Sequence, residues 1–167
     1  MDSEVNLEAK RFLRAIPVFG ALQDRPMDKL LELVQVRRYH PGDFVCAEGE
    51  PGHEMFVVRS GQVEVTKQAQ SGHPATSLAR LGAGDCFGEM SLIDVQRRSA
   101  TVVAREESEL YVLSNKDLYS LYQYDPEAYT LLIMNICREL SRRLRTANNV
   151  IATMLLSLEQ YVRSNLE

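Results

Sequence analysis

The middle of this chain consists of short β-favouring runs separated by turn sequences, and this pattern restricts the fold more than any other feature. Between residues 36 and 113 the turns include Pro41-Gly42-Asp43, Ser60-Gly61 and Gly82-Ala83-Gly84-Asp85. The predicted strands are Val36–Tyr39, Phe44–Cys46, Met55–Arg59, Val63–Lys67, Ser77–Leu81, Thr101–Ala104 and Glu109–Leu113. Many short strands at regular spacing are typical of a barrel, a roll or a jelly roll.

Helical patterns flank this β-rich region on both sides. The predicted helices cover residues 4–16, about 25–35, 114–122 and 126 onward. Asp24 can cap the second helix and Pro26 fits its first turn, while Ser114 and Asp117 have the spacing of a capping box. We therefore expect an α+β fold that is mainly β, in one domain. Its parts are N-terminal helices (1–35), a β-roll (36–113) and C-terminal helices (114–167).

The composition is that of a globular chain without a strongly charged surface. Apolar residues make up 45% of the chain and its net charge is −4, so it has no general attraction for nucleic acid or for an anionic membrane. Met1-Asp2-Ser3-Glu4 carries acid where a signal peptide carries base, and no apolar run reaches the roughly 18 residues that span a bilayer. We expect a cytoplasmic protein whose partners include neither nucleic acid nor a membrane.

The cysteines and histidines do not form a metal-binding or catalytic pattern. The three cysteines are an odd number without close spacing, which favours buried thiols in a reducing compartment. The three histidines lack the paired spacing of a metal site and are expected in turns, and no nucleophile stands beside a base. These residues are Cys46, Cys86, Cys137, His40, His53 and His73. We expect no metal and no enzymatic activity.

The last predicted helix carries a heptad pattern of apolar or small residues. The d positions are Ile133, Leu140, Ala147, Met154 and Tyr161, and the a positions are Cys137, Leu144, Ile151 and Leu158. A seam of about four heptads indicates a coiled coil, so we expect a homodimer through the 126–165 helix. The alternative is a helix that folds back on its own roll, but so long a seam needs a long partner and a small roll is short.

Residues 87–102 place a Gly-Glu pair and an Arg-Ser-Ala run at the two ends of one short connection. Gly88 allows positive φ and close backbone approach, so neighbouring N–H groups can face an anion. Glu89 can accept a hydrogen bond from a sugar hydroxyl, and the guanidinium fork of Arg98 matches phosphate oxygens. Ser99 and the alanine after it add further N–H groups. The segment therefore fits a small phosphorylated ribose.

The ordered pattern F-G-E-x-x-L-(x)5-R-S-A-T-V, set between two predicted strands, resembles the phosphate-binding cassette of cyclic nucleotide-binding domains. Residues 12–19 resemble the N-terminal helical entry of that family, 41–65 its first β-hairpins, and 81–87 the approach to the cassette. The resemblance covers about residues 10–150. One departure is Val95, where many relatives have glycine.

This resemblance implies an eight-stranded jelly-roll β-barrel flanked by N-terminal helices and a long C-terminal helix, with cAMP or cGMP as the ligand. It implies that Glu89 binds the ribose 2′-hydroxyl and that Arg98 binds the cyclic phosphate, while Arg97 is a surface residue. The expected ligand-binding residues are Phe87, Gly88, Glu89, Met90, Ser91, Arg98, Ser99, Ala100, Thr146 and Asn148. Thr146, Asn148 or Asn149 can reach the base from the long helix, and a solvated helix face explains these three equally well.

The functional prediction is a stand-alone cyclic nucleotide sensor that acts on another protein, an effector that the sequence does not identify. Ser99 favours cAMP, because serine occurs there in the bacterial cAMP-responsive branch of the family, whereas threonine is associated with cGMP in the kinase branch. Relatives of the catabolite-activator type carry a helix-turn-helix after the long helix, and too few residues follow Asn149 to form one. Two alternatives stay open: an interaction module that has lost its ligand, and a transcription regulator without a recognisable DNA-binding domain.

Overall fold

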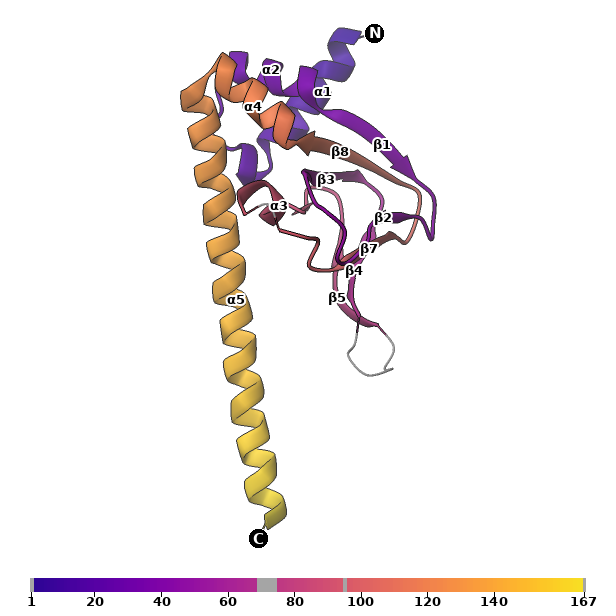
Figure 1. Ribbon diagram of the computed structural model, residues 1–167, viewed down its shortest axis with the longest axis vertical. Helices are drawn as coiled ribbons and strands as arrows, with labels where there is room; N and C mark the ends of the chain where they lie inside the picture. The colour runs from indigo at the N-terminus through magenta and orange to yellow at the C-terminus, as the bar shows by residue number, and fades with distance from the viewer. Residues whose placement is uncertain (1, 69–74, 95, 167) are drawn as a thin grey trace.

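The computed structural model describes residues 2–68, 75–94 and 96–166, and its β-rich body carries one long helix at its side (Figure 1). The described strands are β1 (Gln35–Tyr39), β2 (Phe44–Cys46), β3 (Glu54–Ser60), β4 (Val63–Lys67), β5 (Thr76–Leu81), β6 (Cys86–Phe87), β7 (Thr101–Ala104) and β8 (Ser108–Ser114). The helices are α1 (Asp2–Arg14), the 3-10 helix η1 (Pro17–Phe19), α2 (Asp24–Leu33), α3 (Met90–Ile93), α4 (Asn115–Tyr124) and α5 (Pro126–Leu166).

The strands form two antiparallel sheets, and this arrangement confirms the predicted α+β jelly roll flanked by helices. Within the described residues, one sheet has the order β1-β8-β3-β6 and the other the order β2-β7-β4-β5. The predicted strands differ from those observed by one residue at most at either end. The sequence pattern missed β6, because Cys86–Phe87 is too short to show an alternation of apolar and polar residues.

Helix ends follow the local signals that the sequence contains. The side chain of Ser114 accepts from the backbone N–H of Asp117 at 3.3 Å and Asp117 accepts from the N–H of Ser114 at 2.8 Å, which confirms the capping box of α4. Before α5, the carboxylate of Asp125 accepts from the N–H of Ala128 at 2.9 Å. Both caps satisfy N–H groups that have no partner inside the helix.

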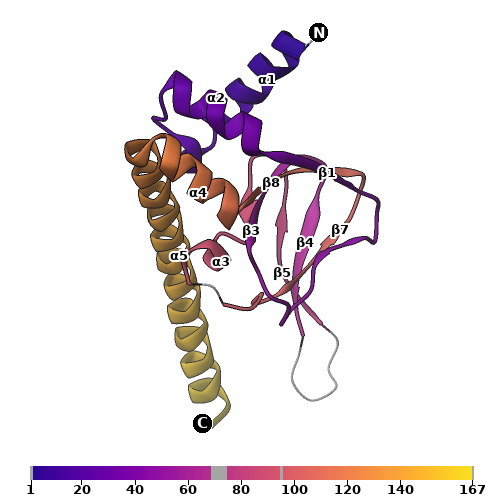
Figure 2. The same cartoon turned by 45° about the horizontal axis from the view of Figure 1, so that its top comes forward.

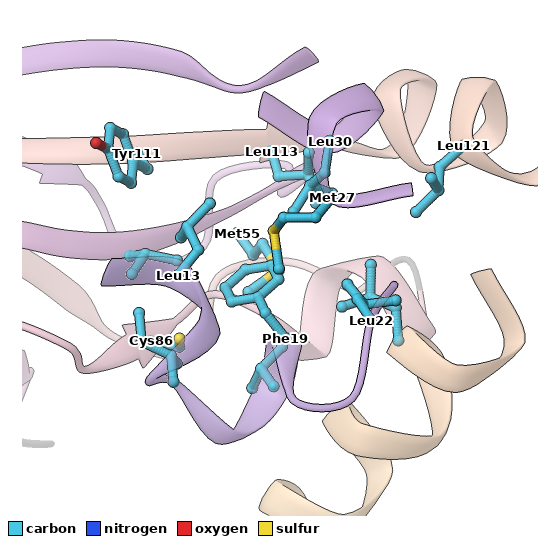
Figure 3. Packing of buried hydrophobic residues seen from close by; sticks show 14 of the residues in the cluster. Leu13, Phe19, Leu22, Met27, Leu30, Met55, Cys86, Tyr111, Leu113 and Leu121 are labelled. Atoms are coloured by element: carbon cyan, nitrogen blue, oxygen red, sulfur yellow. The ribbon is translucent and has the colours of Figure 1, made fainter. Parts of the chain in front are cut away.

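Two hydrophobic clusters hold the layers together, and the strand β3 takes part in both. Met55 and Val57 face the first cluster, between the β1-β8-β3-β6 sheet and the helices. Phe56 and Val58 face the second cluster, inside the roll. Successive residues of a strand point to opposite faces, so this one strand is buried on both sides. Figure 3 shows Met55 and Leu113 meeting side chains that come from the N-terminal helices.

The two halves of α5 have different surroundings. In the first half Ala128, Leu132 and Ile136 are buried against the helical layer, and the side chain of Asn135 donates to the carbonyl of Gly20 at 2.9 Å. In the second half every residue from 141 to 164 is exposed. Figures 1 and 2 both show this half extending beyond the roll, so the helix does not fold back on it. No helix of the described residues is long and apolar enough to cross a membrane.

Candidate functional site

A cavity of about 450 Å³ lies between the inner face of the roll and the 87–102 segment. The segment contributes Phe87, Gly88, Glu89, Met90, Ser91, Asp94, Gln96, Arg97, Arg98, Ser99, Ala100 and Val102 to its lining. The roll adds an apolar wall of Cys46, Val65, Ala79 and Leu81, and α5 adds Arg143. The cavity therefore has a polar side with charges of both signs and an apolar side that suits a flat base.

Gly88 brings the backbone of the segment close to its neighbours, and the tight packing explains why glycine stands there. Its φ is +76°, a region that other L-residues rarely adopt. A Cβ at this position would lie 2.6 Å from Nη1 of Arg98 and 2.9 Å from the carbonyl oxygen of Glu54. Any larger residue would displace the guanidinium or the strand behind it.

Arg98 is almost completely buried, with 8% of its surface exposed, yet it lines the cavity. Its Nη1 donates to the carbonyl of Glu54 at 2.8 Å, and it lies 3.4 Å from the hydroxyl of Ser91. The guanidinium lies over the ring of Phe56, 5.4 Å from its centroid. Backbone and ring thus fix the orientation of a positive charge at the cavity wall, where it can meet an anion without reorganisation.

Glu89 is the negative group of the site and is 4% exposed. Burial raises the pKa of its carboxyl, while the positive charge of Arg143 acts in the opposite direction. Nη1 of Arg143 donates to Oε1 of Glu89 at 3.0 Å, and Nη2 donates to the carbonyl of Cys86 at 2.7 Å. A side chain of α5 therefore connects the long helix to the carboxylate at the cavity.

The structure brings eight of the ten predicted site residues to one cavity, namely Phe87, Gly88, Glu89, Met90, Ser91, Arg98, Ser99 and Ala100. Thr146 and Asn148 do not line it: both are exposed on α5, and the hydroxyl of Thr146 donates to the carbonyl of Arg142 at 3.2 Å. Arg97, expected at the surface, is exposed and also lines the cavity. Among the described residues no cluster of His, Cys, Asp and Glu could hold a metal ion.

Sequence reasoning missed the role of Arg143 as a wall of the cavity. Arg143 belongs to a group of arginines on the long helix that includes Arg138, Arg142 and Arg145. Which of them meets the cavity depends on where α5 crosses the roll, and a helix pattern carries no information on that crossing. The spacing of Glu139 and Arg143 does predict the pair that they form at 3.0 Å.

Comparisons with known proteins agree with this geometry. The family described as "Cyclic nucleotide-binding domain" matches residues 36–125, more than half of the chain. The "Cyclic AMP receptor protein" of Thermus thermophilus is 36% identical over 148 residues, 89% of this chain and 65% of that protein. The human "Cyclic nucleotide-gated channel beta-1" is 40% identical over 152 residues, 89% of this chain and 11% of the channel. The chain thus spans less than two thirds of either relative.

Solved structures of the same kind share the fold. A cyclic nucleotide-binding domain from Methylobacillus flagellatus superposes with a TM-score of 0.77 at 27% identity, covering 89% of this chain and 83% of that structure. The catabolite activator protein of Thermus thermophilus superposes with a TM-score of 0.72 at 35% identity, covering 83% of this chain and 62% of that structure. With its roll, its cavity and a family match that includes the whole of segment 87–102, the chain belongs to the cyclic nucleotide-binding domain family.

Proposed function

We propose that this chain binds a cyclic nucleotide in the 450 Å³ cavity and regulates another protein in response. The observation that supports this most strongly is the pairing of a buried carboxylate, Glu89, with a buried guanidinium, Arg98, in one cavity wall. A phosphodiester with a neighbouring ribose hydroxyl presents one anion and one hydrogen-bond donor, which are the complements of these two groups. Both groups are in place, which argues against an interaction module that has lost its ligand.

We propose cAMP as the preferred ligand. The name of the Thermus thermophilus relative, a cyclic AMP receptor protein, supports this choice, and so does Ser99 beside Arg98. The apolar wall formed by Val65, Ala79 and Leu81 offers no hydrogen-bonding side chain to the amino group and carbonyl that distinguish guanine. A base edge that finds no partner is costly to bury, and adenine has fewer polar groups to satisfy than guanine.

Isothermal titration calorimetry of the whole chain with cAMP, cGMP and 5′-AMP tests this function. We expect saturable heat with cAMP, weaker binding of cGMP, and the weakest binding of 5′-AMP, whose open phosphate carries a second charge. Absence of heat with both cyclic nucleotides would exclude the proposed function. Tighter binding of cGMP than of cAMP would be consistent with a cyclic nucleotide sensor but would contradict the choice of cAMP as its ligand.

We further propose that the ligand signals through α5. Arg143 holds Glu89 and the carbonyl of Cys86, so a ribose hydroxyl that binds Glu89 joins a contact that already includes the long helix. A ligand shifts the helix between two poses only if it binds one of them better. Because Arg143 forms part of the cavity wall, we expect the ligand to favour the pose in which α5 stays against the cavity.

Hydrogen–deuterium exchange measures this coupling. With saturating cAMP, the amides of residues 139–147 are expected to exchange more slowly, whereas those of α2 (Asp24–Leu33), which does not line the cavity, keep their rates. Equal rates in α5 with and without cAMP, in a protein shown to bind it, would contradict the coupling.

The exposed second half of α5 supports a homodimer through this helix. Leu144, Ile151 and Leu158 are 62%, 55% and 59% exposed, and they recur at seven-residue intervals on one face. Pairing two copies in parallel would bury this face, at about 1.5–3 kcal/mol for each fully covered side chain. Single apolar residues on a surface are ordinary, but a continuous apolar stripe of this kind is typical of an interface.

Replacing Ile151 with aspartate is expected to raise the dimer dissociation constant at least about 100-fold, because it removes two buried side chains and places two like charges opposite each other. Asn149→Asp, two residues away on the other side of the helix, adds the same charge outside the seam and is expected to leave the dimer intact. Sedimentation equilibrium reads out both variants. A wild-type chain that stays monomeric at micromolar concentration would exclude the dimer.

A further inference from the structure

The backbone from Arg98 to Ala100 is fixed by contacts on its outer side, away from the cavity. The carbonyl of Arg98 accepts from the N–H of Gly49 at 2.9 Å, and the carbonyl of Ser99 accepts from Nζ of Lys67 at 2.6 Å. Gly49 and Lys67 do not line the cavity, whereas Arg98, Ser99 and Ala100 do. Two successive peptide groups are thus held by their oxygens from behind.

In a trans peptide the C=O and the N–H point in opposite directions, and none of the peptide bonds in the described ranges is cis. The N–H of Ser99 is therefore opposite to the Arg98 carbonyl, and the N–H of Ala100 is opposite to the Ser99 carbonyl. In the described part of the chain neither N–H donates to another protein group. Both are donors on the side of the cavity, at the end where Arg98 carries its positive charge.

Lys67 is itself held in position by a carboxylate. Nζ of Lys67 lies 2.8 Å from Oε1 of Glu48, whose Oε2 accepts from the N–H of Gln68 at 3.0 Å. The hydrogen bond from Lys67 is the largest cause that lowers the pKa of Glu48, so the carboxylate stays ionised near neutral pH. The N–H of Glu48 donates to the hydroxyl of Thr101 at 3.0 Å, which connects Glu48 to the first residue of β7 as well.

We infer that Lys67 is a positioning residue for the phosphate of the ligand, through the peptide group that joins Ser99 to Ala100. Its ammonium fixes the direction of the Ala100 N–H. It also polarises the peptide, because a charge-assisted hydrogen bond to a carbonyl makes the N–H of the same peptide a stronger donor. Lys67 itself stays outside the cavity and has no contact with the ligand. The inference rests on the proposed function.

Lys67→Met tests it, because methionine keeps much of the apolar stem and removes the charge and the donor. We expect the dissociation constant for cAMP to rise about tenfold, because the Ala100 N–H is no longer held in direction and polarised by Lys67, and its hydrogen bond to the charged phosphate is weakened. Lys67→Arg keeps a cationic donor and is expected to restore binding to within about threefold. Lys29→Met removes a lysine that pairs with Glu32 at 2.9 Å on α2, away from the cavity, and is expected to bind cAMP like the wild type.

A second readout separates positioning from general loosening of the fold. In amide NMR spectra, cAMP is expected to move the Ala100 N–H resonance downfield in the wild type and in Lys67→Arg, and much less in Lys67→Met. A wild type that binds neither cAMP nor cGMP would refute the proposed function together with this inference. Two results would refute the role of Lys67 alone, in a wild type that binds cAMP. One is equal affinity of Lys67→Met and wild type. The other is a loss of affinity in Lys67→Met while cAMP moves the Ala100 resonance as far as it does in the wild type.

Discussion

Replacing Arg98 with alanine is expected to weaken the binding of cAMP at least about 100-fold. The guanidinium is the one positive group that the fold buries in the cassette side of the described cavity, and its hydrogen bonds to an ionised phosphate are worth about 1.5–3 kcal/mol each. Each 1.4 kcal/mol corresponds to a tenfold change in the dissociation constant. Calorimetry with cAMP measures the loss directly.

Arg98 also supports the fold, because Nη1 donates to the carbonyl of Glu54. Thermal unfolding of the variant must therefore accompany the titration, and Arg98→Lys provides a milder change that keeps the charge but loses the guanidinium fork. Arg97→Ala is the matched control: its Nη1 donates to the carbonyl of Gly49 at 2.7 Å at the exposed rim, so its loss is expected to change affinity by a few-fold only. A larger loss of affinity for cAMP with Arg97→Ala than with Arg98→Ala would show that Arg97, and not Arg98, binds the phosphate.

Gly88→Ala is expected to lower the free energy of unfolding by about 2–5 kcal/mol and to abolish measurable cAMP binding. A left-handed backbone costs an L-residue about 1–2 kcal/mol, and crowding a packed site costs about 1–3 kcal/mol more. The new Cβ would lie 2.9 Å from the carbonyl oxygen of Glu54 and 2.6 Å from Nη1 of Arg98, so either the strand or the guanidinium has to move. Denaturant unfolding and calorimetry measure the two effects.

Gly84→Ala separates the backbone cost from the crowding. Gly84 also has a positive φ, +92°, but apart from its two neighbours in the chain no atom of the described residues lies within 4 Å of the Cβ that alanine would add. This variant is expected to lose only the backbone term, about 1–2 kcal/mol, and to keep its affinity for cAMP. Equal losses of stability and affinity in the two variants would show that φ, and not the contact with Arg98 and Glu54, accounts for the glycine at position 88.

The sequence predicted well those features that local chemistry determines. The turn glycines separate the strands, and the alternation within runs such as Val63–Lys67 placed that strand correctly to the residue. The capping box of α4 follows from Ser114 and Asp117 alone. The 87–102 segment could also be predicted from the sequence. Eight of the predicted site residues lie within fourteen positions of one another, and a short connection brings them to one cavity.

Features that depend on how distant segments meet were not predictable in this way. Arg143 reaches Glu89 across 54 positions of sequence, and the carbonyl of Glu54 that receives Arg98 lies 44 positions away. These contacts follow from the register of β3 and from the crossing of α5, neither of which has a local pattern. The same limit explains the wrong prediction that Thr146 and Asn148 line the cavity. The sequence places both residues on the long helix, but it does not show at which residue the helix passes beyond the cavity.

The double burial of β3 links the helical layer mechanically to the cavity. Met55 packs among the helices, and its neighbour Phe56 lies beneath the guanidinium of Arg98 and stacks on Phe87, with ring centroids 4.9 Å apart. Because both side chains leave one stretch of extended backbone, a twist of the strand that moves the first must also tilt the second. We therefore expect a helix that shifts against one face of β3 to move Phe56 on the other face, and with it the guanidinium of Arg98 at the cavity wall.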